Sequence, residues 1–434
     1  MIWNKPMEFA EREIMNKLQL AKLKQTIKHV YANCEPYRVK MQEAGLTPED
    51  INSLEDLQKL PFTYKSDLRD NYPYGMFSVP LSSIVRIHAS SGTTGKPTVV
   101  GYTRKDLDSW AECFARCLAM AGGDSKSVVQ VAYGYGLFTG GLGAHAGAEY
   151  VGASVIPMSS GNTEKQILLM KDFKSTTLCC TPSYALTIAE AIEKNPEISL
   201  DDISLKSGIF GAEPWTVEMR KEIEKRLNIR AHDIYGLSEI MGPGVSCSCE
   251  HQNGMHINED YFLPEIIDPE TLEVLPHGEK GELVFTTIGK EGIPLIRYRT
   301  RDIAYLMPET CECGRTTIRM SRVMGRTDDM LIIRGVNVFP TQIETVIANF
   351  AELTMNYKII VDRVNNSDTF EIQIELAEGL TFDNIKFIES LRAKLSHELR
   401  SILGISAKLT FLNEGTLPRS EGKAVRVEDR RDLV

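Results

Sequence analysis

The sequence lacks any run of about 18 apolar residues, so we expect no membrane-spanning helix. Its first residues, Met1 to Glu8, lack the basic stretch and apolar core of a secretory signal. Positive charge is also in deficit, because 49 Lys and Arg residues face 59 Asp and Glu residues, which gives a net charge of −10. These absences argue against membrane and nucleic-acid partners, and they predict a soluble cytoplasmic protein.

Cysteine is scarce as well, with nine residues among 434, and the number is odd. A chain of this size with so few cysteines does not depend on a disulfide scaffold, so we expect reduced thiols in a reducing cytoplasm. Four of the nine form two Cys-x-Cys pairs, Cys247 with Cys249 and Cys311 with Cys313. Such pairs can act as metal ligands.

What the chain does contain is an alternation of β-like and helical runs from about residue 84 to residue 240. This alternation predicts an α/β architecture with largely parallel sheets. Glycine, proline and β-forming residues over 242–305, with an Asn253-Gly254 hairpin signal, predict a β-rich subdomain. The character changes again after Gly325, so we expect a large domain over residues 1–325 and a small α+β domain over residues 326–434.

The expected elements follow from apolar periodicity and turn residues. In the large domain, strands are expected at 84–89, 97–102, 128–132, 154–157, 177–180, 207–210 and 231–235, and helices at 8–34, 106–120, 163–172, 183–194 and 216–228. In the small domain, a helix is expected from about 341, strands at 357–362 and 369–376, a helix at 383–402 and a strand at 407–412.

The most distinctive motif is the loop Ser90-Ser91-Gly92-Thr93-Thr94-Gly95-Lys96-Pro97-Thr98. Glycines let backbone N–H groups approach an anion, hydroxyls donate hydrogen bonds and Lys96 adds charge, so the loop suits a phosphate. It is not a Walker A loop, because only Thr93 and Thr94 separate Gly92 from Gly95 and a strand rather than a helix follows. The alternative is a simple polar turn in a β-hairpin.

The loop and the motifs after it resemble the acyl-adenylate-forming enzymes, the superfamily of acyl-CoA synthetases, adenylation domains and luciferases. The later motifs are Gly211-Ala212-Glu213-Pro214, Tyr235-Gly236-Leu237-Ser238-Glu239, Arg299-Thr300-Arg301-Asp302, Gly325-Arg326-Thr327-Asp328-Asp329 and Ser420-Glu421-Gly422-Lys423. Three longer segments, 292–302, 329–340 and 417–424, resemble the phenylacetate–CoA ligase branch more closely. The resemblance covers essentially the whole chain.

The resemblance implies an acyl-CoA synthetase-like fold, with a large α/β domain followed by a mobile α+β domain. It also implies an AMP-forming acid–thiol ligase. In such an enzyme an aryl carboxylate attacks the α-phosphate of ATP, diphosphate leaves, and the thiol of CoA then displaces AMP from the acyl-adenylate. Phenylacetate is the expected acid, while hydroxyphenylacetate, indoleacetate and benzoate-like acids stay open.

The same resemblance assigns residues to each part of the reaction. Catalytic roles fall to Lys423, Glu239 and Lys96, with Glu239 also as the Mg²⁺ ligand. Contacts to ATP or AMP are expected from Ser90, Ser91, Gly92, Thr93, Thr94, Gly95, Lys96, Gly211, Ala212, Glu213, Pro214, Asp233, Tyr235, Gly236, Ser238, Asp302 and Arg326. The aryl acid pocket is expected from Tyr133, Tyr135, Gly136, Phe138 and Gly211. Contacts to CoA are expected from Arg334, Gly335 and Val336, and the hinge between the domains at Asp328.

Two other functions stay open. One is an adenylating enzyme that loads the acid onto the thiol of a carrier protein. The 434 residues hold no carrier domain, which disfavours this function but leaves a separate carrier protein open as the partner. The other is a non-catalytic nucleotide sensor, which would predict loss of the reacting residues. The reacting residues Lys96, Glu239, Asp302, Arg326 and Lys423 are all present. A homodimer is possible.

The two Cys-x-Cys pairs lie about sixty residues apart and predict a structural zinc site. A two-residue Asn253-Gly254 turn would set His251 opposite His256 and bring these two histidines and the first Cys pair onto one face. Two ligands from this face would join Cys311 and Cys313. The resemblance favours Cys249 and His256, with Cys247 and His251 as reserves. The alternative is four reduced cysteines on surface loops.

Overall fold

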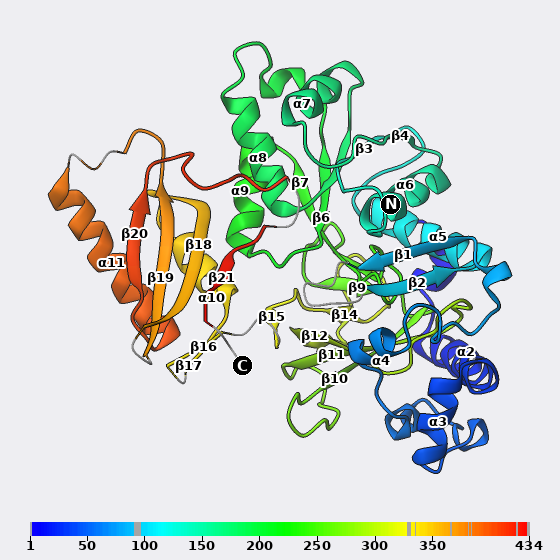
Figure 1. Cartoon of the computed structure of the whole chain (residues 1–434). Coiled ribbons are helices and arrows are strands. Elements are labelled where there is room, and N and C mark those ends of the chain that lie inside the picture. Colours follow the sequence, from blue (N-terminus) through cyan, green and yellow to red (C-terminus); the bar gives the residue numbers. More distant parts are fainter. Residues whose placement is uncertain are drawn as a thin grey trace.

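The computed structural model describes residues 2–90, 97–327, 331–334, 336–364, 367–380, 382, 384–421 and 424–431. A large N-terminal domain and a small C-terminal domain lie side by side (Figure 1). The strands form one nine-stranded sheet, two four-stranded sheets and two two-stranded sheets.

The nine-stranded sheet is the centre of the large domain, with the order β13-β14-β9-β8-β7-β6-β5-β3-β4. Its strands are β3 (Val128–Val131), β4 (Ser154–Ile156), β5 (Thr177–Cys180), β6 (Ser207–Gly211), β7 (Arg230–Tyr235), β8 (Ser246–Cys247), β9 (Met255–Ile257), β13 (Leu306–Met307) and β14 (Arg319–Met320). The neighbours among β4, β3, β5, β6 and β7 pair in parallel. The neighbours among β7, β8, β9, β14 and β13 pair antiparallel. The parallel half confirms the expected α/β architecture.

Helices cover both faces of the parallel half. They are α5 (Arg104–Met120), α6 (Gly140–Val151), α7 (Thr163–Asp172), α8 (Pro182–Glu193) and α9 (Val217–Leu227). Side chains of α7, α8 and α9 share one buried cluster, and those of α5 and α6 share another. Thr103, Thr181 and Thr216 begin α5, α8 and α9, and each side chain accepts a hydrogen bond from the backbone N–H three residues later.

The sequence did not predict α6, because its first turns are rich in glycine, a poor helix former. The helix follows from packing instead. A Cβ atom on Gly143 would lie 2.3 Å from the ring of Trp110, and one on Gly147 would lie 2.4 Å from Phe114. The two glycines therefore give α6 a smooth face against which the aromatic side chains of α5 pack.

The remaining elements of the large domain surround this sheet. The N-terminal helices are α1 (Lys5–Glu8), α2 (Arg12–Asn33), α3 (Glu35–Glu43) and α4 (Lys65–Asp70). Short 3-10 helices lie at Pro48–Asp50, Glu55–Lys59 and Leu81–Ser83, and another lies between α8 and β6 at Leu200–Asp202. The other strands are β1 (Arg86–Ser90), β2 (Thr98–Tyr102), β10 (Phe262–Ile267), β11 (Gly281–Thr287), β12 (Tyr298–Ala304) and β15 (Gly325–Arg326). The helix expected over residues 8–34 is α2, which begins later, at Arg12, and the short helix α1 precedes it.

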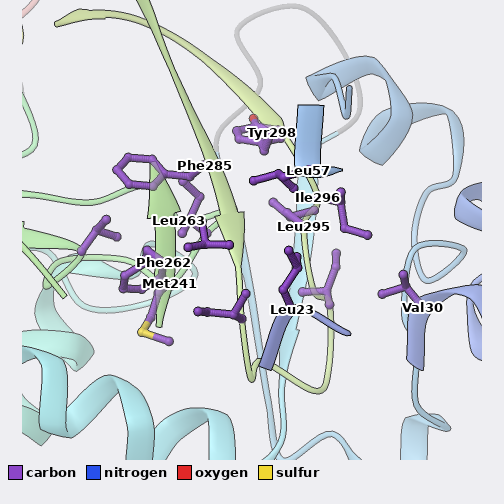
Figure 2. Close-up of a cluster of buried hydrophobic side chains, with 14 of the residues drawn as sticks. Leu23, Val30, Leu57, Met241, Phe262, Leu263, Phe285, Leu295, Ile296 and Tyr298 are labelled. Atoms are coloured by element: carbon purple, nitrogen blue, oxygen red, sulfur yellow. The ribbon is translucent and has the colours of Figure 1, made fainter. Parts of the chain in front are cut away.

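A large apolar cluster joins the N-terminal helices to the four-stranded sheet β10-β11-β12-β15. Leu23 of α2 and the rings of Phe262 and Phe285 are fully buried in it (Figure 2). At about 25 cal/mol per Å² of apolar surface removed from water, such rings contribute strongly to stability. The N-terminal helices are therefore part of the body of the large domain.

The expected β-rich subdomain over residues 242–305 is only partly right. β8 and β9 extend the nine-stranded sheet, whereas β10, β11 and β12 belong to the separate four-stranded sheet. The strand register that we predicted from a two-residue turn at Asn253-Gly254 is wrong. Cys247, not His251, pairs with His256, because the connection spans residues 248–254 rather than two residues. Gln252 and Gly254 both take positive φ angles in this longer turn.

The small domain has its own buried core and a four-stranded sheet of order β20-β19-β18-β21. Its elements are β16 (Leu331–Ile333), β17 (Val336–Val338), α10 (Pro340–Ile347), β18 (Leu353–Val364), β19 (Ser367–Leu376), α11 (Ile385–Leu403), β20 (Lys408–Leu412) and β21 (Val427–Asp429). The expected helices and strands are present, and β16, β17 and β21 are additional. Within the residues described, no helix of either domain is long and apolar enough to cross a membrane.

Candidate active site

A cavity of about 1110 Å³ opens where the parallel strands end. The segments that follow β3, β5, β6 and β7 all contribute to its wall, through Tyr133, Thr181, Ala212 and Gly236. The carboxyl ends of parallel strands meet at one edge of a sheet, which is where open α/β folds bind ligands. Residues of strand β12 and helix α4 also line the cavity.

Most of the residues expected at the nucleotide site line this cavity. They are Ser90, Ala212, Glu213, Pro214, Asp233, Tyr235, Gly236, Ser238, Glu239, Asp302 and Arg326. Gly211 does not line the cavity, and a Cβ atom on it would lie 2.2 Å from the carbonyl oxygen of Ile234. Residues 91–96, 328, 335 and 423 lie outside the described residues, so the expectations for Ser91, Gly92, Thr93, Thr94, Gly95, Lys96, Asp328, Gly335 and Lys423 are not addressed. The strands beside the loop, β1 and β2, do form the expected antiparallel hairpin.

Asp302 is the centre of one polar cluster in the cavity wall. Its Oδ2 accepts a hydrogen bond from the Tyr235 hydroxyl at 2.6 Å, and its Oδ1 pairs with Nη1 of Arg326 at 2.9 Å. Burial raises the pKa of the Tyr235 hydroxyl well above its usual value, so the hydroxyl stays a donor. Strands β12 and β15 pair at Asp302 and Arg326, so the backbone sets this contact.

Glu239 is the centre of a second cluster. Its Oε1 lies 3.2 Å from Nζ of Lys65 and accepts a hydrogen bond from the Ser90 hydroxyl at 3.5 Å. The carboxylate is nearly buried but faces the cavity, as a ligand for a divalent cation must. Sequence reasoning missed Lys65, because a lone lysine at the start of α4 belongs to no motif and only the fold brings it to Glu239.

Lys290 supports the segment that carries Glu239. Its ammonium is buried and donates to the carbonyl oxygens of Glu239 at 3.3 Å and Ile240 at 2.6 Å, over the ring of Tyr102. Burial lowers the pKa of Lys290 to about 8. The hydroxyl of Tyr102 donates to the carbonyl oxygen of Ser238 at 3.1 Å. Both side chains therefore hold this segment through its backbone.

Glu213 makes contacts that the sequence did not suggest. Its Oε1 accepts hydrogen bonds from the backbone N–H of Ser183, at 2.7 Å, and from the Ser183 hydroxyl. Its Oε2 accepts one from the backbone N–H of Ala424, at 2.8 Å. Both oxygens thus bind protein, and Glu213 connects the start of α8 to the C-terminal segment.

Only some of the residues expected at the aryl acid pocket line the cavity. Tyr133 and Phe138 line the cavity, and Phe138 is half exposed there. Tyr135 and Gly136 do not line it, and the Tyr135 hydroxyl lies 3.2 Å from Nδ1 of His145 instead. The two residues expected to contact CoA and described here, Arg334 and Val336, lie in the small domain and do not line the cavity.

Four residues of the large domain form a compact cluster away from this cavity. The ligand atoms of Cys249, His256, Cys311 and Cys313 all lie within 4.8 Å of one another. The sulfur atoms of Cys249 and Cys311 are 3.6 Å apart, and Sγ of Cys313 lies 3.4 Å from Nε2 of His256. Two thiolates on one zinc ion, each at about 2.3 Å in a tetrahedron, would be about 3.8 Å apart. The donor set and spacing therefore fit zinc.

The reserve ligands take no part in this cluster. The sulfur of Cys247 faces the carbonyl oxygen of Cys117 at 3.9 Å, and His251 pairs with Glu312 at 3.2 Å. Nδ1 of His256 lies 3.0 Å from the Thr317 hydroxyl, which orients the ring so that Nε2 faces the sulfur atoms.

Asp233 is a buried carboxyl group in the cavity wall, and burial raises its pKa to about 6 against the opposing charges of Arg322 and Arg220. Because ionisation is harder in the folded protein, the wild type should lose stability relative to Asp233→Asn as the pH rises from about 4 to about 6. One pKa unit corresponds to about 1.4 kcal/mol, so the difference should reach up to about 3 kcal/mol above pH 6. Urea denaturation of the ligand-free protein at pH 4 and pH 8 measures it.

The exposed Asp201→Asn variant is the control for this experiment. Its stability relative to the wild type should not follow the same trend. A difference between wild type and Asp233→Asn that is equal at pH 4 and pH 8 would contradict the raised pKa.

Family models match both domains of the chain. One described as "AMP-binding enzyme" matches residues 21–289, and one described as "AMP-binding enzyme C-terminal domain" matches residues 335–431. Together the two models cover the large sheet, the cavity and the small domain.

Curated relatives match this chain over almost its full length. The phenylacetate-coenzyme A ligase of Escherichia coli (strain K12) is 52% identical over 434 residues, which cover 99% of this chain and 98% of that protein. The phenylacetate-coenzyme A ligase of Thermus thermophilus is 47% identical, with 99% of this chain and 100% of that protein covered.

A solved structure matches equally broadly. A crystal structure of 2-hydroxyisobutyryl-CoA ligase in the postadenylation state has a TM-score of 0.92 and 27% identity, and the match covers 99% of this chain and 92% of that chain. The same ligase in the thioesterification state has a TM-score of 0.74 and 28% identity, with 99% and 93% covered. From the fold, the cavity and the full-length relatives, we conclude that the chain belongs to the AMP-binding enzyme family, among the phenylacetate–coenzyme A ligases.

Proposed function

We propose that this protein is an ATP-dependent phenylacetate–CoA ligase. The observation that carries the proposal is the cavity at the carboxyl ends of the parallel strands, where Asp302, Tyr235 and Arg326 form one polar cluster and Glu239 another. Its support is the 52% identity to a phenylacetate-coenzyme A ligase along the whole chain. The products would be the aryl-CoA thioester, AMP and diphosphate.

In this proposal the two polar clusters hold opposite ends of ATP. The Asp302 carboxylate, oriented by Tyr235 and Arg326, would accept hydrogen bonds from the ribose hydroxyls. Lys65, Ser90 and the loop with Lys96 would hold the phosphate oxygens at the end near Glu239. Binding both ends would place the α-phosphate in line with the acid, so that positioning supplies much of the rate. The acid would occupy the part of the cavity lined by Tyr133 and Phe138.

We propose Mg²⁺ as the metal of the reaction, with Glu239 as its protein ligand. Mg²⁺ prefers one or two carboxylates together with phosphate oxygens, and it would neutralise charge on the leaving diphosphate. The remaining expectations at the nucleotide site, including Gly211, Glu213 and Asp233 at the adenine side, stay proposals on the same footing.

We further propose that the domains divide near residues 325 and 326 and that the small domain rotates at Asp328 between the two steps. One arrangement would bring Lys423 to the acid and the α-phosphate, and the other would bring Arg334, Gly335 and Val336 to CoA. The proposal is supported by the two states of 2-hydroxyisobutyryl-CoA ligase, because this chain matches the postadenylation state at a TM-score of 0.92 and the thioesterification state at only 0.74.

The direct test is incubation of the purified protein with ATP, Mg²⁺, phenylacetate and CoA. We expect equal amounts of phenylacetyl-CoA, AMP and diphosphate, and faster turnover with phenylacetate than with hydroxyphenylacetate, indoleacetate or benzoate. Diphosphate without a thioester would favour the carrier-protein alternative. Neither product with any acid would favour the nucleotide sensor and contradict the proposal.

Lys423 should act in the first half-reaction. Its neighbour in the chain, Ala424, donates a hydrogen bond to Glu213 in the cavity wall, and the resemblance assigns Lys423 to the acid and the α-phosphate. Removal of a charge that acts mainly in the transition state should lower the rate of adenylation by about 100-fold or more. The Lys423→Ala variant should still convert preformed phenylacetyl-AMP to thioester at a rate much closer to that of the wild type. Equal slowing of both half-reactions would contradict the role.

We propose zinc for the cluster of Cys249, His256, Cys311 and Cys313. Four protein ligands would leave no open position for a substrate, so the ion would be structural. None of the nine cysteines, eight of which are buried, forms a disulfide bond, which supports the proposal that the protein acts in a reducing cytoplasm. A homodimer stays a prediction from the resemblance, and the mass in solution decides it.

Purified protein should contain about one zinc ion per chain by elemental analysis. The variants Cys311→Ser and Cys313→Ser should lose the metal and unfold at lower temperature, because structural zinc contributes to folding. Cys247→Ser is the matched control, since this buried thiol lies outside the cluster, and it should keep its zinc. Zinc-free wild-type protein of full stability would rule out the site.

A further inference from the structure

One face of α8 is turned toward the small domain. Ser183, Thr187, Glu190 and Lys194 follow one another at steps of three or four residues, the spacing of one helix face. All four line a cavity of about 420 Å³ between α8, α9 and the small domain. The helix therefore presents a polar stripe to a domain that begins more than 130 residues further along the chain.

The C-terminal segment runs along this stripe in the opposite direction. At its far end the N–H of Ala424 donates to Glu213, which also holds Ser183 at the start of α8. In the middle Arg419 pairs with Glu190, and at the near end Glu414 pairs with Lys194 at 2.6 Å. In Figure 1 the segment after β20 crosses toward α8 and α9 before it returns to β21.

Arg419 uses all parts of its guanidinium in this contact. Nε and Nη2 donate to the two carboxylate oxygens of Glu190, at 3.0 and 3.2 Å. Nη1 donates to both oxygens of Glu375, at 3.0 and 2.8 Å. Paired hydrogen bonds to a carboxylate are the strongest that arginine makes, and they define direction as well as distance.

The two carboxylates belong to different domains. Glu375 lies in β19 of the small domain with a fully buried side chain, and it also accepts the N–H of Leu417 at 2.6 Å. Arg419 and Glu375 would therefore move together in any rotation of the small domain. Glu190 lies in α8 of the large domain, so the contact between Arg419 and Glu190 is the part that such a rotation must break.

We propose that Glu190 and Arg419 are positioning residues that dock the C-terminal segment on α8 and so place Lys423 for adenylation. The proposal rests on the proposed function, in which Lys423 serves only the first half-reaction. Three residues separate Arg419 from Lys423 in the sequence, and Ala424, which contacts Glu213, follows Lys423 directly. The contacts with the large domain are thus made by Arg419 and Ala424, which precede and follow Lys423 in the sequence.

The chemistry of this pair suits a contact that is made and broken in each turnover. About a fifth of each side chain, 21% for Arg419 and 22% for Glu190, is exposed. Partly exposed ion pairs contribute modestly because water competes for both charges, and they weaken with salt. Separation leaves each group able to return to water, so the alternative arrangement does not carry a buried unpaired charge.

The test compares the two half-reactions of Glu190→Gln, an isosteric change that removes the negative charge and touches no substrate. Adenylation, measured as diphosphate released in a single turnover without CoA, should slow by about 5-fold, the upper end of what a partly exposed ion pair contributes. Thioester formation from preformed phenylacetyl-AMP and CoA should stay within about 2-fold of the wild type or become faster. The loss in adenylation should shrink as salt is raised, because salt also weakens the pair in the wild type.

Glu193→Gln is the matched control, because Glu193 lies on the same helix but pairs with Arg226 of α9 within the large domain. It should leave both half-reactions unchanged. Lys423→Ala, run in parallel, separates this proposal from the one on which it depends. If Lys423→Ala blocks adenylation while Glu190→Gln adenylates like the wild type, the docking pair is wrong and the role of Lys423 stands. If Glu190→Gln slows both half-reactions equally, the pair is merely structural and the proposal is overturned.

Discussion

The parallel pairing of β6 with β7 is the constraint on which the site depends. Gly211 lies opposite Ile234, so close that no Cβ atom would fit against the Ile234 carbonyl oxygen. The segments that leave the two strands therefore emerge side by side, one with Glu213 and the other with Tyr235 and Glu239. Strand β12 then meets Tyr235 through Asp302. A chain that paired these strands differently would scatter the four side chains, whatever their order in the sequence.

The sequence predicted those features in which local pattern and tertiary structure agree. Short apolar runs bounded by turns became the strands β3 to β7, and the helices expected at 183–194 and 216–228 are α8 and α9. The motifs that carry the resemblance identified much of the cavity wall, where Glu213 follows β6, Tyr235 ends β7 and Asp302 lies in β12. What failed depends on contacts between distant segments. The helix α6 exists because Gly143 and Gly147 admit the rings of α5, and no local preference encodes that.

The same limit explains the errors at single residues. Lys65 of α4 pairs with Glu239, which lies far away in the chain. No sequence pattern around either residue indicates the other. The register of the β8–β9 hairpin depends on a seven-residue connection that the Asn253-Gly254 pair does not reveal. Nevertheless Cys249 and His256 meet Cys311 and Cys313, because the cluster needs only the approach of two short segments. The segment that contains Cys311 and Cys313 also contacts the N-terminal helix α1, because Arg315 pairs with Glu8 at 2.5 Å and both side chains are fully buried.

Burial divides the ion pairs of this molecule into two kinds. Arg116 and Asp260, like Arg315 and Glu8, are almost entirely buried, so separation would leave a charge without water and is strongly opposed. Such pairs join elements that must stay together within the large domain. The pairs that connect α8 to the small domain, Glu190 with Arg419 and Lys194 with Glu414, keep part of their surface in water. A contact of this second kind defines an orientation while the domains are together and still permits them to part, which is what an enzyme with two half-reactions in one cavity requires.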